Sequence, residues 1–154
     1  MVKAAALAAA LLVPLTCAAQ QPQPQEARFR YLGRAGEFAV LATEAQGPRD
    51  RRALIAVAAN LKPSGPRGAD NATLALVFDC DANTVHAVRA TVYLGEDQLG
   101  DFTATSDPIA PTPGSPNGVA FAFACEGTVP AGPAIWIDSE PEARAYARMQ
   151  VKLD

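Results

Sequence analysis

Two cysteines, Cys80 and Cys125, constrain the fold of this chain more than any other feature. Each closes an apolar segment, residues 74–80 in one case and residues 119–125 in the other. In an exported protein, cysteines that end apolar segments are most simply explained by one buried disulfide between two elements of a single core. We therefore expect one domain that contains both segments, with the disulfide in a structural role.

The first residues have the features of a secretory signal peptide. Lys3 gives a short positive start, an apolar stretch covers residues 4–15, and small residues at positions 17 and 19 precede a cleavage point. The apolar stretch is shorter than the roughly twenty residues of a membrane-spanning helix, and polar residues follow it at once. We therefore expect residues 1–19 to be removed on export, and we expect no transmembrane segment.

Cys17 leaves an alternative open, because it could become the lipid-bearing first residue of a bacterial lipoprotein. Such proteins usually carry Leu and a small residue where this chain has Pro14 and Thr16. If Cys17 instead leaves with the signal peptide, an even pair of cysteines remains, as one disulfide requires. Cys17 is thus a candidate lipidation position, and the mature form is either lipid-anchored or soluble.

Charge and composition narrow the class of protein. The chain has 154 residues, a formal net charge of −3 and no basic stripe. Proteins that bind nucleic acid usually carry a clustered positive charge, so we expect no nucleic-acid partner. Scarce lysine with abundant alanine, proline and arginine is typical of a GC-rich bacterial genome. We therefore expect a periplasmic, outer-envelope or secreted bacterial protein, large enough for one domain.

The rest of the chain divides into a Gln/Pro linker at residues 20–27, a domain at residues 28–127 and an extension at residues 128–154. Strand-like patterns recur in the domain, separated by turn-rich segments. They cover residues 29–32, 37–43, 53–60, 73–80, 84–94 and 98–103. Strands that follow one another through short turns predict an antiparallel meander.

Side-chain alternation predicts which residues share a face of these strands. The range 53–60 is apolar on both faces, as expected of a central strand. In the range 84–94, one face is expected to carry Val88, Ala90, Val92 and Leu94, and the other Arg89, Thr91 and Tyr93.

Residues 119–125 fit either a strand or a short helix. Their Val/Phe/Phe/Cys alternation indicates a strand, whereas Ser115 as an N-cap, Pro116 at the first helical position and Gly127 as a stop indicate a helix. We favour the helix, because alanine occupies every second position.

The extension is expected to hold a brief apolar strand at residues 134–137, followed by a helix. A capping-box pattern at residues 139–142 opens this helix, which continues to Gln150. The predicted fold class is therefore α+β: an antiparallel meander sheet with a disulfide-tethered short helix and a C-terminal helix. Within the extension, Trp136 and Tyr146 could form an exposed ligand patch, although core packing is the simpler interpretation.

Catalytic groupings are weak. His86, the only histidine, follows Asp79, Cys80 and Asp81, but a disulfide-bonded cysteine is not a nucleophile, and one histidine with carboxylates is a poor zinc site. Phosphate-loop, nucleophile-elbow and metalloprotease motifs are all missing from the sequence. We therefore expect no enzymatic activity, no metal and no cofactor, with a hydrolase using His86 and Asp79 or Asp81 as the minority hypothesis.

Several segments together resemble the surface-adhesin protein E-like domain family. These are Phe78-Asp79-Cys80, a strand ending in Tyr93-Leu94 before a Gly turn, and Pro113-Gly114-Ser115 before the apolar run to Cys125. Members are small exported bacterial proteins with an antiparallel sheet and a C-terminal helix held to it by a disulfide. The resemblance implies that Cys80 and Cys125 form this bridge and that Ser115 starts the bridged helix.

This chain departs from the family pattern in two places. Asp107-Pro108-Ile109-Ala110 stands where many members carry a tryptophan, and residues 128–154 lie beyond the family's core. From the export signal, the cysteine pair and the absence of catalytic groupings, we expect a non-enzymatic envelope or secreted domain of the adhesin E-like type that binds a protein or surface partner through its sheet or loops. The binding residues are not indicated. The alternative function is that of a periplasmic small-ligand carrier or inhibitor.

Overall fold

A computed structural model of the chain describes residues 27–63, 65–103 and 107–152. Its seven strands form one sheet in the order β6-β5-β4-β3-β2-β1-β7, and all neighbours are antiparallel. The strands are β1 (Phe29–Ala35), β2 (Phe38–Ala42), β3 (Arg51–Asn60), β4 (Asn71–Asp79), β5 (Thr84–Leu94), β6 (Asp97–Thr103) and β7 (Trp136–Ile137). The expected meander is confirmed. The predicted signal peptide at residues 1–19, with the candidate lipidation position Cys17, and residues 20–26 lie outside the described residues.

Two helical segments accompany the sheet. The first is α1 (Pro116–Phe121), which continues into a π-helical turn, η2 (Ala122–Glu126), and the second is α2 (Glu140–Gln150). A 3-10 turn, η1 (Pro66–Gly68), lies between β3 and β4. The α+β class is therefore confirmed. Of the helices in the described ranges, none has the length and apolar character to cross a membrane.

The helical interpretation of residues 119–125 is confirmed in its local detail. The Ser115 side chain accepts a hydrogen bond from the Gly118 amide at 3.3 Å, as an N-cap should. Gly127 ends the segment with φ 69°, a left-handed conformation in which a side chain would be strained. Ser139 occupies the N-cap of α2 as expected, but its side chain makes no capping hydrogen bond.

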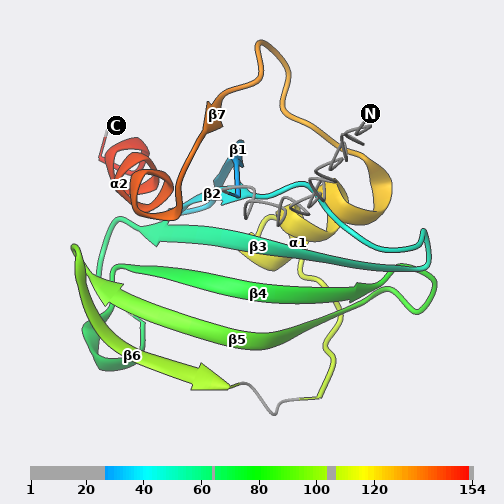
Figure 1. Cartoon of the computed structure of the whole chain (residues 1–154), viewed down its shortest axis with the longest axis horizontal. Coiled ribbons are helices and arrows are strands. Elements are labelled where there is room, and N and C mark those ends of the chain that lie inside the picture. The colour runs from blue at the N-terminus through cyan, green and yellow to red at the C-terminus, as the bar shows by residue number, and fades with distance from the viewer. Residues whose placement is uncertain (1–26, 64, 104–106, 153–154) are drawn as a thin grey trace, which may run out of the picture.

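The two helices pack on opposite faces of the sheet. Along β2, Val40 is buried toward α1 and its neighbour Leu41 toward α2. On β3, Ala56 is likewise buried toward α1 and Val57 toward α2. Figure 1 shows α2 near the end of β3 at which that strand finishes, and α1 toward the other end of the long strands. Each helix thus covers part of one face.

A disulfide joins Cys80 to Cys125, with their Cα atoms 5.5 Å apart. Cys80 follows β4 and Cys125 lies in η2, so the bond ties the helical segment to the sheet. Beneath it, the rings of Phe78 and Phe121 meet edge to face, with centroids 6.0 Å apart. The predicted strand-to-helix disulfide is therefore confirmed.

One prediction about β5 is wrong. Ala75 pairs with Arg89 and Leu76 with Ala87, which leaves Val88 as the extra residue of a β-bulge. A bulge interrupts the alternation of side chains, so the residues on either side of it change face. Val88 therefore does not share the face of Ala90 as simple alternation predicts; it is 38% exposed and faces the same hollow as Ala75.

The C-terminal extension is part of the same sheet. In the pairing of β7 with β1, Ile137 lies opposite Phe29, and both contribute to the core under α2. The helix adds Ala143, Ala147 and Val151 to that core. The extension therefore determines which part of this face is covered.

Candidate functional site

The face of the sheet that carries α2 is only partly covered. On β3, Val57 and Ala59 are fully buried and contribute to the core under the helix. Ile55, which points to the same face one step earlier in the alternation, is 38% exposed, and Ala53 is exposed as well. The helix thus leaves the first half of β3 open.

A groove with a volume of about 770 Å³ lies over this uncovered part of the sheet. Its floor is formed by small and branched aliphatic side chains from three neighbouring strands. They are Ala53 and Ile55 of β3, Ala75 and Val77 of β4, and Val88 at the bulge of β5. Its rim is formed by Arg28, Thr43, Glu44, Gln46 and Trp136.

The floor can offer a ligand little except apolar contact. Its strands are internal strands of the sheet, so their backbone groups are used by the ladders that join β3, β4 and β5. A partner therefore cannot bind here by adding a strand. Binding would instead remove apolar area from water, at about 25 cal/mol per Å² buried.

The rim beside β3 is held in place by hydrogen bonds to the backbone of that strand. Thr43 and Ile55 are joined twice: the Thr43 amide donates to the Ile55 carbonyl at 2.9 Å, and the Ile55 amide donates to Thr43 Oγ1 at 3.0 Å. Gln46 and Ala53 exchange two bonds of 2.8 Å. This wall of the groove is thus fixed to its floor.

The opposite wall is built around Trp136. The Arg28 guanidinium lies 5.4 Å from the ring centroid, and the Arg30 guanidinium lies 5.8 Å from it. Arg28 also donates from Nε to Asp138 at 2.8 Å. These contacts are cation–π pairs and one exposed ion pair, which together orient the indole at the edge of the groove.

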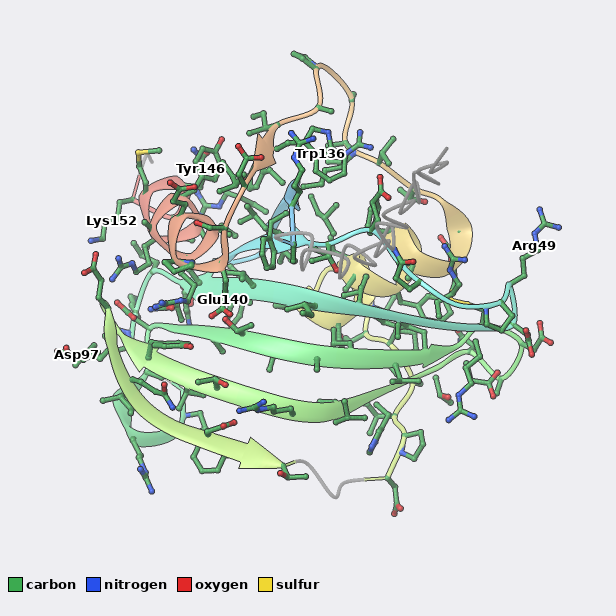
Figure 2. The ribbon with its side chains drawn as sticks, in the orientation of Figure 1. Arg49, Asp97, Trp136, Glu140, Tyr146 and Lys152 are labelled. Atoms are coloured by element: carbon green, nitrogen blue, oxygen red, sulfur yellow. A yellow bond between two sulfur atoms is a disulfide. The ribbon has the colours of Figure 1, made fainter. Side chains whose placement is uncertain are left out.

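A half-buried polar cluster fixes α2 to the sheet. Thr73 and Tyr93 donate hydrogen bonds to Glu140 Oε1 at 2.8 and 3.2 Å, and Figure 2 shows Glu140 at the start of the helix, beside the sheet. The Arg144 guanidinium lies 3.7 Å from the centroid of the Tyr93 ring. Burial, and next the charge of Glu140, raise the pKa of Tyr93. The cluster sets where the helix stops covering the sheet.

The buried part of this cluster is incompletely satisfied. Arg144 is a buried residue, and its Nε lies 3.4 Å from Glu140 Oε1. The contact counts as an ion pair, but its geometry falls short of a hydrogen bond, and Nε has no other partner among the residues described. We therefore attribute the contribution of Arg144 mainly to charge and to stacking on Tyr93.

An ion pair occupies the same face near the sheet edge. Arg89 donates from Nε to Asp101 at 2.9 Å and makes a second, shorter bond with the same carboxylate. The hydrogen bond from Arg89 lowers the pKa of Asp101. Thr91 also donates to this carboxylate, at 3.3 Å. The charge of Arg89 is therefore already balanced beside the groove.

Among the described residues, no hydrogen bond joins His86 to Asp79 or Asp81, although the register places Asp79 and His86 on the same face. Cys80 is in the disulfide, and Asp79 accepts a hydrogen bond from the Ala82 amide at 2.7 Å within the turn after β4. His86 lies on β5 opposite Val77, and Asp81 is exposed in the turn. Within the described ranges there is also no group of three or more His, Cys, Asp or Glu residues that could hold a metal.

The groove residues were missed at the level of sequence for a physical reason. A strand that is buried on both faces and a strand that is partly exposed on one face can have the same apolar sequence pattern. Only the length of α2 and its position decide that Ala53 and Ile55 remain open. Val88 was missed because a bulge leaves no reliable mark in a single sequence.

The chain is a small α+β domain with an apolar groove on one face of an antiparallel sheet. Comparison of the chain with family models, with curated proteins and with solved structures finds no match.

Proposed function

We propose that this protein is an exported bacterial envelope or secreted domain of the adhesin E-like type, without enzymatic activity, that binds a protein or surface partner. The observation that carries the proposal is the apolar groove on the uncovered face, floored by Ile55, Val77 and Val88. Exposed apolar surface that is rimmed by polar residues is typical of interaction sites. The signal-like start of the sequence and the disulfide support the exported location.

The arrangement of the groove favours a binding role over a purely structural one. The start of α2 is fixed at Thr73 by the hydrogen bond to Glu140, and the helix leaves Ile55, one step further along the same face, 38% exposed. The rim at Thr43 is preorganised by hydrogen bonds to the floor, so a ligand would not have to order it. A preformed apolar surface that costs little to order is well suited to recognition.

A second candidate function is that of a periplasmic small-ligand carrier or inhibitor. The volume of about 770 Å³ lies within the range of about 300–1,000 Å³ typical of small-molecule sites. An elongated apolar compound could lie along the aliphatic floor with its polar end at the rim. This alternative predicts binding of a lipid-like compound without any protein partner.

One pair of variants separates the two functions. Ala75→Arg places a long charged side chain on the floor, and Ala131→Arg makes the same change at an exposed position before β7, outside the groove lining. Each purified protein is immobilised and exposed to envelope extract and to matrix proteins, and its thermal shift with decanoate is recorded. Partner capture that is lost only in Ala75→Arg supports the proposal.

Two results would count against the proposal. Reproducible stabilisation by decanoate that is abolished in Ala75→Arg, without any captured partner, favours the carrier function instead. Equal capture by both variants would show that the partner binds elsewhere.

A further inference from the structure

A second hollow, separate from the floor of the groove, lies between β7 and α2 and has a volume of about 430 Å³. The side chains that characterise it are aromatic, acidic or sulfur-containing. They are Trp136 and Asp138 beside β7, and Glu142, Tyr146 and Met149 of α2. Figure 2 shows Trp136 and Tyr146 on the side of the sheet that carries α2. At the level of sequence, core packing was the simpler interpretation of these two aromatic residues and a ligand patch was the alternative.

The charged groups in the lining of this hollow are carboxylates, while Arg28 and Arg30 lie against the Trp136 ring beside it. Its lining includes two carboxylates and, among the residues described, no Lys or Arg. Asp138 is paired with Arg28 at 2.8 Å, whereas no ion pair is recorded for the exposed Glu142 within the described part of the chain. The hollow thus offers one carboxylate that is not neutralised.

The aromatic wall already binds guanidinium groups within the same molecule. Arg28 and Arg30 lie 5.4 and 5.8 Å from the centroid of the Trp136 ring, which shows that the ring accommodates such groups. Tyr146 is held edge to face against Tyr31, with centroids 5.5 Å apart, so its ring is fixed at the hollow. With two guanidinium groups already beside Trp136, it is the Tyr146 ring that can attract a further cation or line its apolar stem.

We propose that this hollow binds the guanidinium of an arginine side chain on a polypeptide partner. Glu142 accepts hydrogen bonds from the guanidinium, and Tyr146 with Met149 packs against its stem. A guanidinium suits the hollow better than a quaternary ammonium, because the latter has no N–H group to donate to Glu142. The inference rests on the proposed function in one respect only, that the partner is a polypeptide.

The test uses the tryptophan signal, which is unique because the chain contains one tryptophan. The full chain is titrated with the blocked peptide acetyl-Gly-Arg-Gly-amide, and the indole N–H resonance of Trp136 is followed by NMR. The matched control peptide replaces arginine by citrulline, which has the same shape without the charge. We expect saturable shifts with the arginine peptide and at least about two- to five-fold weaker binding of the citrulline peptide.

Variants locate the binding. Glu142→Gln is expected to weaken binding of the arginine peptide by about two- to five-fold, as for the loss of an exposed ion pair. The control is Glu126→Gln, which changes an exposed carboxylate outside the hollow and should leave binding unchanged. Ala75→Arg should also leave it unchanged, because Ala75 belongs to the other groove. The arginine peptide can therefore fail to bind while partner capture by the groove is retained. Partner capture can equally be absent while the arginine peptide binds.

Three outcomes would overturn the inference. The first is equal affinity for the arginine and citrulline peptides. The second is binding that is unaffected by Glu142→Gln. The third is tighter binding of choline than of the arginine peptide, which would indicate a site for a lipid headgroup instead.

Discussion

Ile55 of β3 and Ala75 of β4 are directly paired on the face that α2 leaves uncovered. Two residues further along β3, Val57 pairs with Thr73, and Val57 is completely buried in the core under the helix. The boundary between the core and the open groove therefore falls within a single strand, between two residues that point the same way.

This boundary predicts unequal costs for two similar truncations. Val57→Ala should lower the free energy of unfolding by about 2 kcal/mol, because it leaves a cavity under α2. Ile55→Ala removes a larger part of a side chain but should cost about 1 kcal/mol or less, because the site already opens to water. Urea denaturation of both variants measures the difference. Equal costs would mean that the face is covered around Ile55.

The disulfide should be a major part of the stability. A bond between residues separated by 45 positions constrains the unfolded chain by about 4 kcal/mol in the chain-entropy account. The double variant Cys80→Ser/Cys125→Ser should therefore lose about 2–4 kcal/mol, a large fraction of a typical total of about 5–15 kcal/mol. Denaturation with and without reductant provides the check. The wild-type protein should lose stability on reduction and the double variant should not.

The polar cluster under α2 should act as a coupled unit. Glu140 accepts from Tyr93 at 3.2 Å, so Glu140→Gln and Tyr93→Phe each remove one side of the same contact. We expect a coupling energy of about 0.5–2 kcal/mol in a double-mutant cycle of unfolding free energies. Purely additive effects would show that this contact does not help to hold α2.

The free energy of unfolding should fall at alkaline pH, because two tyrosines, Tyr31 and Tyr93, lose their protons. Burial raises the pKa of Tyr31, with Tyr146 as the next cause, and burial followed by the charge of Glu140 raises the pKa of Tyr93. A raised folded-state pKa gives stability that is complete below the unfolded value of about 10 and is lost as the pH rises through the folded value.

Urea denaturation at a series of alkaline pH values, with tyrosinate absorbance followed in parallel, tests this dependence. In Tyr93→Phe the loss of stability with rising pH should be shallower than in the wild-type protein. An identical slope in both proteins would contradict the assignment to Tyr93.

Local signals in the sequence predicted much of the fold. Ser115, Pro116 and Gly127 each have a preference that depends on a few neighbouring residues, and together they identified the bridged helix correctly. The pairing of Cys80 with Cys125 was predicted from the expected export of the protein and from the two cysteines that remain after the signal peptide. The bounds of β5 were also predicted correctly, because a long alternating run between turns is a strong pattern.

The candidate site could not be predicted in the same way, because it depends on tertiary arrangement. The position of Val88 depends on a bulge opposite Ala75, and the exposure of Ile55 depends on where a helix 85 to 95 residues later in the chain is packed. Neither relationship is encoded within a short window of sequence. The resemblance to an adhesin-like domain suggested a binding role without indicating which face performs it.

Photo-crosslinking from the floor of the groove tests the central claim most directly. The full chain carrying p-benzoylphenylalanine in place of Ala75 is exposed to envelope extract under light, and the same substitution at Ala131 is the control. We predict a discrete crosslinked product from position 75 that disappears when Ile55→Arg is added, and none from position 131. Crosslinking from position 131 alone, or a product that Ile55→Arg does not affect, would contradict the claim that the uncovered face binds the partner.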